Sequence, residues 1–214
     1  MNGVRSLAAC LVLAGLVLPA RAARTDRVGV GLASGLFVPA MKEVREIYGL
    51  APPVALVLTW TKKSGLAFGL GFEYLSAGGR TVGSAEESLP LRLRLWTVPA
   101  SINYEWDYGW IRFSAGLGAA LNIYRERWEA EGLEGLSDEG QRLGVFARGT
   151  AEIPVSSRLS AAGIARYGTV STNVRSYLGN SVNLGGATLL VGLSYSFSAD
   201  VAVGVGSGRR RDER

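Results

Sequence analysis

The chain has 214 residues, with 29 glycines, no histidine and a formal net charge of +5 at pH 7. This length suits one sizeable domain, and so small a positive excess argues against a nucleic-acid-binding surface. Without histidine, catalytic groups and metal sites built on imidazole are excluded, so we expect no enzyme activity, no metal and no cofactor.

Residues 1–23 are predicted to be a secretory signal peptide. Arg5 precedes an apolar run from Leu7 to Leu18, and small residues follow at Ala20 and Ala22. This order of basic, apolar and small residues is typical of export signals. Cleavage would remove the single cysteine, Cys10, so we expect the mature chain to fold without a disulfide.

After the signal, segments that alternate between apolar and small or polar residues recur along the chain. In chain order we predict strands at 27–38, 53–63, 65–76, 91–106, 109–126, 142–154, 158–170 and 184–197. Most are near the length with which a tilted strand crosses a bilayer. Tight turns alternate with long polar connectors at 39–52, 77–90, 127–141 and 171–183. The pattern predicts an all-β protein, an eight-stranded antiparallel up-and-down transmembrane β-barrel over residues 24–197.

The two faces of the predicted strands differ in composition. One is apolar and almost free of charge, with aromatic residues near the strand ends, and the other carries glycine and scattered charges. This favours a membrane barrel with a polar lumen, and a soluble periplasmic binding barrel is the alternative. In 91–106 the apolar residues change from odd-numbered positions (Leu91, Leu93 and Leu95) to even-numbered positions (Val98 and Ile102). Such a change of parity predicts a bulge near Pro99.

Charged residues on the polar parity form a candidate ion-pair network in the lumen. Arg92 and Arg94 are expected to join it near the loops. A turn centred on Tyr108–Gly109 would place Glu105 opposite Arg112, and Glu152 could pair with Arg158. The network could gate a narrow passage or simply fill the interior, and the width of eight strands favours filling. Its members are Glu73, Glu105, Arg112, Arg148, Glu152 and Arg166.

The last predicted strand ends in Gly192-Leu-Ser-Tyr195-Ser-Phe197. The mature sequence resembles the small outer-membrane β-barrel proteins of the OmpA/OmpX type, and Gly192, Tyr195 and Phe197 match the assembly signal of that class. The resemblance implies insertion by the barrel-assembly machinery and contact with outer-membrane lipid and lipopolysaccharide; we expect a monomer. In that family the Phe commonly ends the chain, whereas here 198–214 follows, and its composition predicts a flexible basic periplasmic tail.

Two connectors have distinctive patterns. Residues 39–50 space Met41, Val44, Ile47 and Tyr48 on one side, which predicts a short amphipathic helix at the interface or over the mouth. Residues 125–142 are acidic, which is typical of a solvated loop. We therefore predict a bacterial outer-membrane barrel with a structural, envelope-integrity or surface-interaction role; the alternative is a narrow pore for small polar or amphipathic solutes.

Overall fold

The computed structural model describes residues 26–82, 88–129, 137–170 and 184–198. The predicted signal peptide and nearly all of the predicted tail lie outside the described residues. The elements are β1 (Arg27–Pro39), α2 (Lys42–Tyr48), β2 (Val54–Thr61), β3 (Leu66–Val82), β4 (Ser88–Asp107), β5 (Arg112–Trp128), β6 (Ser137–Pro154), β7 (Leu159–Val170) and β8 (Gly186–Ser198).

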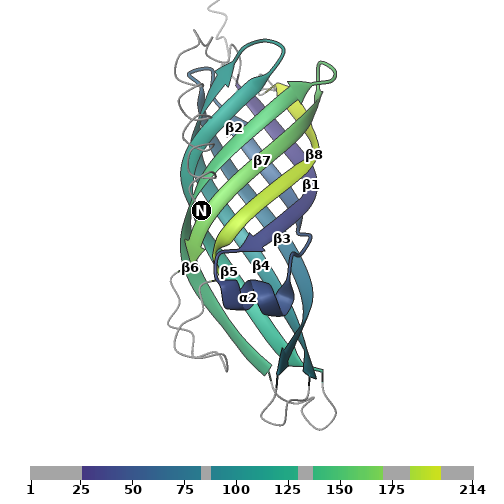
Figure 1. Cartoon of the computed structure of the whole chain (residues 1–214). Helices are drawn as coiled ribbons and strands as arrows, with labels where there is room; N and C mark the ends of the chain where they lie inside the picture. Colours follow the sequence, from purple (N-terminus) through teal and green to yellow (C-terminus); the bar gives the residue numbers. More distant parts are fainter. Residues whose placement is uncertain (1–25, 83–87, 130–136, 171–183, 199–214) are drawn as a thin grey trace, which may run out of the picture.

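The strands form one closed antiparallel barrel in the order β1 to β8 (Figure 1). Each strand pairs with its neighbour in the chain. β8 closes the wall by pairing with β1, and the ladder runs from Arg27 opposite Ser198 to Pro39 opposite Gly186. Closure leaves no unpaired edge in this part of the wall, which is the main advantage of a barrel over an open sheet. The predicted fold class is confirmed.

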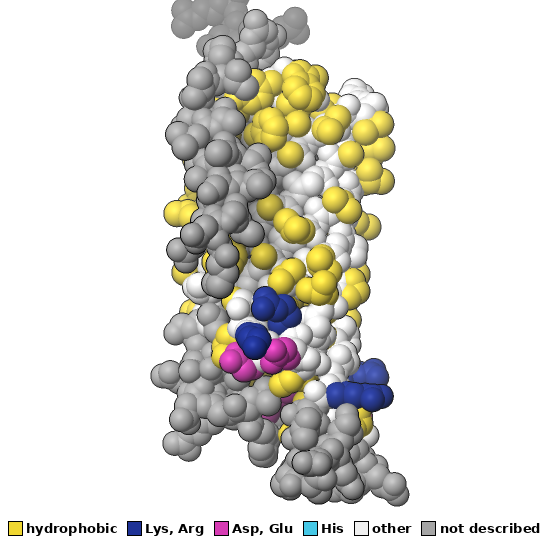
Figure 2. All heavy atoms as spheres, in the orientation of Figure 1, with side chains coloured by type: hydrophobic (Ala, Val, Ile, Leu, Met, Phe, Trp, Pro, Cys, Tyr) yellow, Lys and Arg dark blue, Asp and Glu magenta, His cyan; other side chains and the backbone are white. Residues whose placement is uncertain are grey.

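The apolar parity faces outward. Leu117 on β5 and Val191 on β8 are 70% and 72% exposed, and many other large apolar side chains share that surface. Figure 2 shows these hydrophobic side chains spread over the barrel wall. An exposed apolar surface of this extent is expected where the barrel meets lipid, so it forms the membrane-facing band.

Four strands continue beyond the closed wall at the end that carries the long loops. The β1–β2 ladder ends where Ser34 pairs with Val54, and Val54 in turn pairs with Tyr74 of β3. Beyond this level β3, β4, β5 and β6 pair only with one another, and we call residues 75–82, 88–95, 124–128 and 137–143 the strand extension. Much of the predicted loops 77–90 and 127–141 is therefore strand.

No bulge interrupts β4. Ile102 lies opposite Phe68 and Leu95 lies opposite Leu75, so the register is the same on both sides of Pro99. The predicted bulge is therefore wrong. The apolar residues change sides because the inner side of β3 and β4 in the extension is apolar. As a result Arg92 and Arg94 point outward, away from the lumen in which we predicted them.

Helix α2 covers the apolar inner side of the extension. Its side chains Val44 and Tyr48 are buried against β3, β4 and β5. The close approach needs Gly79, because a Cβ there would lie 2.7 Å from the carbonyl oxygen of Ile47. The buried partners of the helix are Leu75, Ala77, Leu91, Leu93, Leu95 and Tyr124. The predicted amphipathic helix is thus present and folds over the barrel mouth.

Candidate functional site

The lumen is crossed near the tight turns by an ion pair between β1 and β4. Arg27 Nη2 lies 2.5 Å from Glu105 Oε2 and 2.7 Å from Glu105 Oε1. Thr61 Oγ1 donates a longer hydrogen bond of 3.4 Å to the same carboxylate. The Arg27 and Glu105 side chains are only 16% and 6% exposed. Because β1 and β4 are not neighbours, this pair bridges the interior.

The predicted hairpin pair between Glu105 and Arg112 is not formed. The β4–β5 pairing is shifted by two residues from the register that we assumed. Glu105 therefore lies opposite Ser114, and Arg112 lies opposite Asp107. Arg112 Nη2 is instead 3.5 Å from Glu152 Oε2 on β6. It also donates a 2.5 Å hydrogen bond to Ser160 Oγ on β7.

The predicted pairing of Glu152 with Arg158 is also absent. Glu152 takes Arg112 as its partner, and Arg158 donates a 3.2 Å hydrogen bond from Nη1 to Tyr195 Oη. Arg158 follows the β6–β7 turn, where it is exposed. Glu152 and Arg158 thus flank the same turn, but each side chain bonds to a different partner.

A second ion pair crosses the lumen nearer the loop end, from β3 to β7. Arg166 donates two hydrogen bonds of 2.6 Å, one to each oxygen of Glu73. The guanidinium also lies 5.3 Å from the centre of the Phe146 ring and 3.3 Å from Thr188 Oγ1. Planar bidentate pairs of this kind combine geometric specificity with strong charge-assisted bonds.

Arg148, the sixth predicted network residue, lies between the two crossing pairs without a carboxylate partner among the described residues. Its Nε donates a 3.2 Å hydrogen bond to Thr150 Oγ1. Asn103 and Ser101 bond to each other at 3.0 Å nearby, and both are buried. The structure thus brings five of the six predicted residues into ion pairs. Arg148 lies directly opposite Arg166 in the β6–β7 ladder, with Glu73 and Glu152 near enough to act on its charge but not in an ion pair with it.

Between the Glu73–Arg166 pair and the mouth lies a small cavity of about 50 Å³. Polar side chains such as Thr97 and Asn122 line the side nearer the ion pair. Phe37, Leu95 and Leu184 line the side nearer the mouth. Its volume is enough for a few water molecules. The cavity is too small for a sugar or a lipid.

At the mouth, Tyr48 of α2 donates a hydrogen bond to Glu126 Oε1 on the extension. Burial, reinforced by the Glu126 charge, raises the pKa of the Tyr48 phenol far above its usual value. Burial also raises the pKa of the Glu126 carboxyl, the hydrogen bond from Tyr48 lowers it, and nearby Asp138 raises it. The contact thus joins α2 to the barrel through two groups that both favour their protonated forms.

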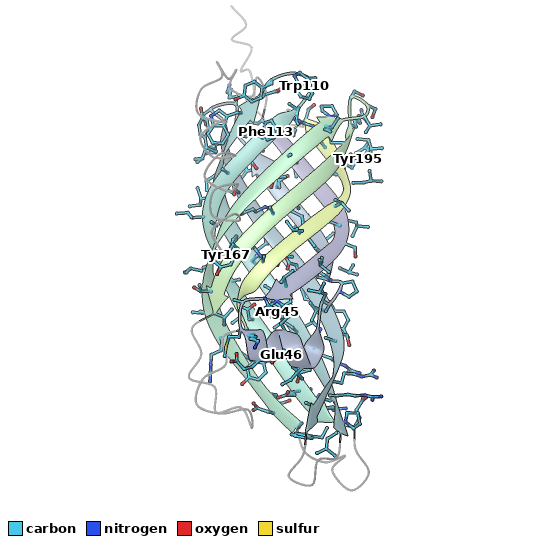
Figure 3. All side chains as sticks on the ribbon, in the orientation of Figure 1. Arg45, Glu46, Trp110, Phe113, Tyr167 and Tyr195 are labelled. Atoms are coloured by element: carbon cyan, nitrogen blue, oxygen red, sulfur yellow. The ribbon has the colours of Figure 1, made fainter. Side chains whose placement is uncertain are left out.

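The predicted assembly signal lies in β8, where Phe197 pairs with Val28 of β1. The centres of the Tyr195 and Phe197 rings are 4.8 Å apart, and the rings contact edge to face on the outer surface. A Cβ on Gly192 would lie 2.0 Å from the carbonyl oxygen of Leu32, so this glycine permits the close approach of β8 to β1. Figure 3 shows Tyr195, Trp110 and Phe113 at the same end of the barrel, the turn end, where an aromatic belt is expected.

Sequence reasoning missed several residues of this site. Arg27 was assigned to the first strand but not to the network, although its parity relative to Gly29 placed it on the polar face. Ser160 and Thr61 carry no charge and gave no signal. The contact between Tyr48 and Glu126 joins segments 78 residues apart, and only the closed fold brings them together.

Solved structures with the same architecture are known. The chain is similar to a major outer membrane protein from Thermus thermophilus, with a TM-score of 0.59 and 12% sequence identity over 80% of this chain and 99% of that one. This is the fold of an outer-membrane barrel. The predicted resemblance to small outer-membrane barrels is confirmed at the level of the fold.

Two further structures are less similar. Neisserial surface protein A has a TM-score of 0.48 and 16% identity over 80% of this chain and 97% of its own. Ail, the attachment invasion locus protein of Yersinia pestis, has a TM-score of 0.46 and 11% identity over 82% and 99%. No family model and no curated protein matches the sequence.

No group of three or more His, Cys, Asp or Glu side chains in residues 26–82, 88–129, 137–170 and 184–198 is placed to hold a metal ion. Within the same ranges, no helix is both long and apolar enough to cross a membrane.

Proposed function

We propose that the protein is an exported, monomeric outer-membrane barrel with a closed lumen, and that its role is a surface interaction made by the strand extension. The observation that carries this proposal is the contrast between the two ends. Ion pairs from β1 to β4 and from β3 to β7 cross the interior, whereas β3 to β6 continue beyond the apolar band at the loop end.

The outer-membrane location rests on the exposed apolar band and on the fold. The similar Thermus protein is itself an outer membrane protein, and the aromatic pairs at the two ends of the band are typical of membrane interfaces. Tyr74 and Trp96 contact at 5.7 Å at the loop end, and Tyr104 and Trp106 contact at 5.1 Å at the turn end. We place the loop end on the cell surface.

The closed lumen is tested by recording current through planar bilayers that contain the refolded mature chain. With insertion confirmed, we expect no discrete conductance from the wild type. The double variant Glu73→Ala, Arg166→Ala serves as the control for an opened interior. Steady channel activity of the wild type would refute the proposal and favour the narrow pore for small polar or amphipathic solutes.

Location and orientation are tested in intact cells with a membrane-impermeant maleimide. A cysteine at Gln141, on the exposed outer side of the extension, should be labelled. A cysteine at Ser157, in the β6–β7 turn, should react only after the cells are broken. Release of both variants with the soluble periplasmic proteins would instead favour the soluble binding barrel.

We also propose that the barrel-assembly machinery reads β8. Phe197 lies on the outer surface beside Tyr195, where a partner protein has access before the barrel closes. Phe197→Ala should lower the amount of folded barrel in cells and leave spontaneous refolding into vesicles nearly unchanged. An equal loss in both settings would mean that Phe197 serves only the folded structure.

A further inference from the structure

The outer face of the strand extension carries a group of arginines that we call the arginine patch. Its members are Arg80 on β3, Arg92 and Arg94 on β4, and Arg125 and Arg127 on β5. The side chains are exposed or half-buried. Figure 2 shows basic side chains projecting at the lower right, beside the lower ends of β3 and β4.

The arrangement of the patch is unfavourable for the barrel alone. Arg92 lies directly opposite Arg127, and Arg94 lies directly opposite Arg125. Like charges that face each other across a ladder destabilise the pairing. A sequence that keeps two such pairs side by side retains them at a cost to the fold, which points to an anionic ligand.

Nearby carboxylates balance only part of this charge. Arg92 Nε lies 2.7 Å from Glu129 Oε1, and Arg125 Nε lies 3.2 Å from Glu139 Oε2. No carboxylate in the described part of the chain forms an ion pair with the other three members, Arg80, Arg94 and Arg127. Among the described residues, five arginines against two glutamates leave an excess of three positive charges on this face.

The patch begins where the apolar band ends. On β4 the next outward residue from Arg94 toward the membrane is Trp96. On β5 the next outward residue from Arg125 toward the membrane is Ile123. One such step along a strand is about 7 Å. The guanidinium groups therefore lie just outside the hydrocarbon layer, at the depth of lipid headgroups, with the aromatic ring of Trp96 at the boundary.

We infer that the arginine patch binds the phosphate groups of the anionic glycolipid of the outer leaflet, lipopolysaccharide. Arginine matches phosphate with two parallel hydrogen bonds, and adjacent arginines on two strands can hold two phosphates of one headgroup. This inference rests on the proposed function, because it takes the extension to stand in the outer leaflet.

A lipid fits the patch better than a soluble polyanion. Arg94 is half-buried and stands one step from the apolar band. A ligand that bound there from the aqueous side would have to reach down to the membrane surface, whereas a lipid headgroup is already at that level. The binding energy would then also include the contacts of the acyl chains with the band.

The test uses the mature chain in nanodiscs of phosphatidylcholine, to which bisphosphorylated lipid A is added in steps. We expect the unfolding temperature of the wild type to rise with lipid A. In Arg94→Gln, Arg127→Gln the half-maximal lipid A fraction should increase about fivefold per arginine, or about thirtyfold for the pair. Lipid A without its phosphates, or inorganic pyrophosphate alone, should give no rise.

The matched control is Lys62→Gln, Lys63→Gln, which removes the same charge at the turn end. In nanodiscs with lipid A in both leaflets, this control should keep the wild-type response. In lipid without lipid A, the arginine variant should unfold no earlier than the wild type, because it relieves like-charge repulsion; this shows that it is folded.

Three results would overturn the inference: an arginine variant that responds like the wild type, an equal loss in the lysine control, or a rise produced by free pyrophosphate or heparin without lipid A. Because nanodiscs expose both ends of the barrel to lipid A, this test is independent of the orientation of the barrel in cells. The maleimide experiment can therefore fail while the lipid site stands, and the reverse also holds.

Discussion

The ion pair between Glu73 and Arg166 gives the sharpest test of the lumen. Both hydrogen bonds are 2.6 Å long, and the side chains are 10% and 14% exposed. Removing one partner of such a buried pair costs about 3–5 kcal/mol, because the other charge is left unpaired. Arg166→Met should lie at the upper end of this range. Glu73→Gln should lie near its lower end, since Arg166 keeps its contacts with Thr188 and Phe146.

The double variant Glu73→Gln, Arg166→Met separates the pair from its surroundings. Since it removes both charges of the pair, it should be more stable than Arg166→Met alone, with a coupling free energy of about 3 kcal/mol. The free energy of unfolding is measured in vesicles with urea, followed by tryptophan fluorescence and gel mobility. Glu46→Gln, in the exposed pair with Lys42, should change it by less than about 0.5 kcal/mol. If the effects of the two single changes simply added in the double variant, the pair would not stabilise the closed lumen.

Three further predictions follow from other parts of the barrel. Arg112→Ala should lower the unfolding temperature in a heat-modifiability gel, because it leaves a buried carboxylate on β6 without its partner; an unchanged temperature would contradict this. Leu117→Arg places a charge on the lipid face and should cost about 2–4 kcal/mol of folding into vesicles, whereas Gln141→Arg, at the edge of the band opposite Ile123, should cost about 1 kcal/mol or less; equal effects would argue against a membrane-facing band. Since the pKa of Tyr48 is raised on docking of α2, the contribution of Tyr48 to docking is fully present below the usual value of 10.0 and should be lost as the pH rises above it; a spin label at Glu46 would show this as increased mobility above that pH, and a spectrum that does not change there would refute it.

The eight strands and their faces could be predicted because period-two alternation is a local property. Each outward leucine of β1, β2 and β8, and each inward glycine of β1 and β8, is fixed by its own segment and by the lipid or lumen that it faces. The network members were found for the same reason, since parity alone places Glu73 and Arg166 in the lumen.

The partners within the network could not be predicted, because they depend on register and on closure. A shift of two residues in the β4–β5 turn moves Glu105 from Arg112 to Ser114. The partner that Glu105 takes, Arg27, comes from a strand three positions away in the wall. No local pattern encodes such a distance, which is set only when β8 pairs with β1.

The error on β4 shows where period-two patterns change their meaning. Inside the band, the apolar parity faces outward to lipid. Beyond it the outer face meets water and headgroups, so the same strand turns its arginines outward and its leucines inward without a change of register. On β5 the change falls at the same level, between Ile123 and Arg125 outside and between Asn122 and Tyr124 inside. A parity change that recurs on paired strands without a bulge therefore marks the membrane surface. It also requires a cover for the apolar inner side, and α2 supplies it.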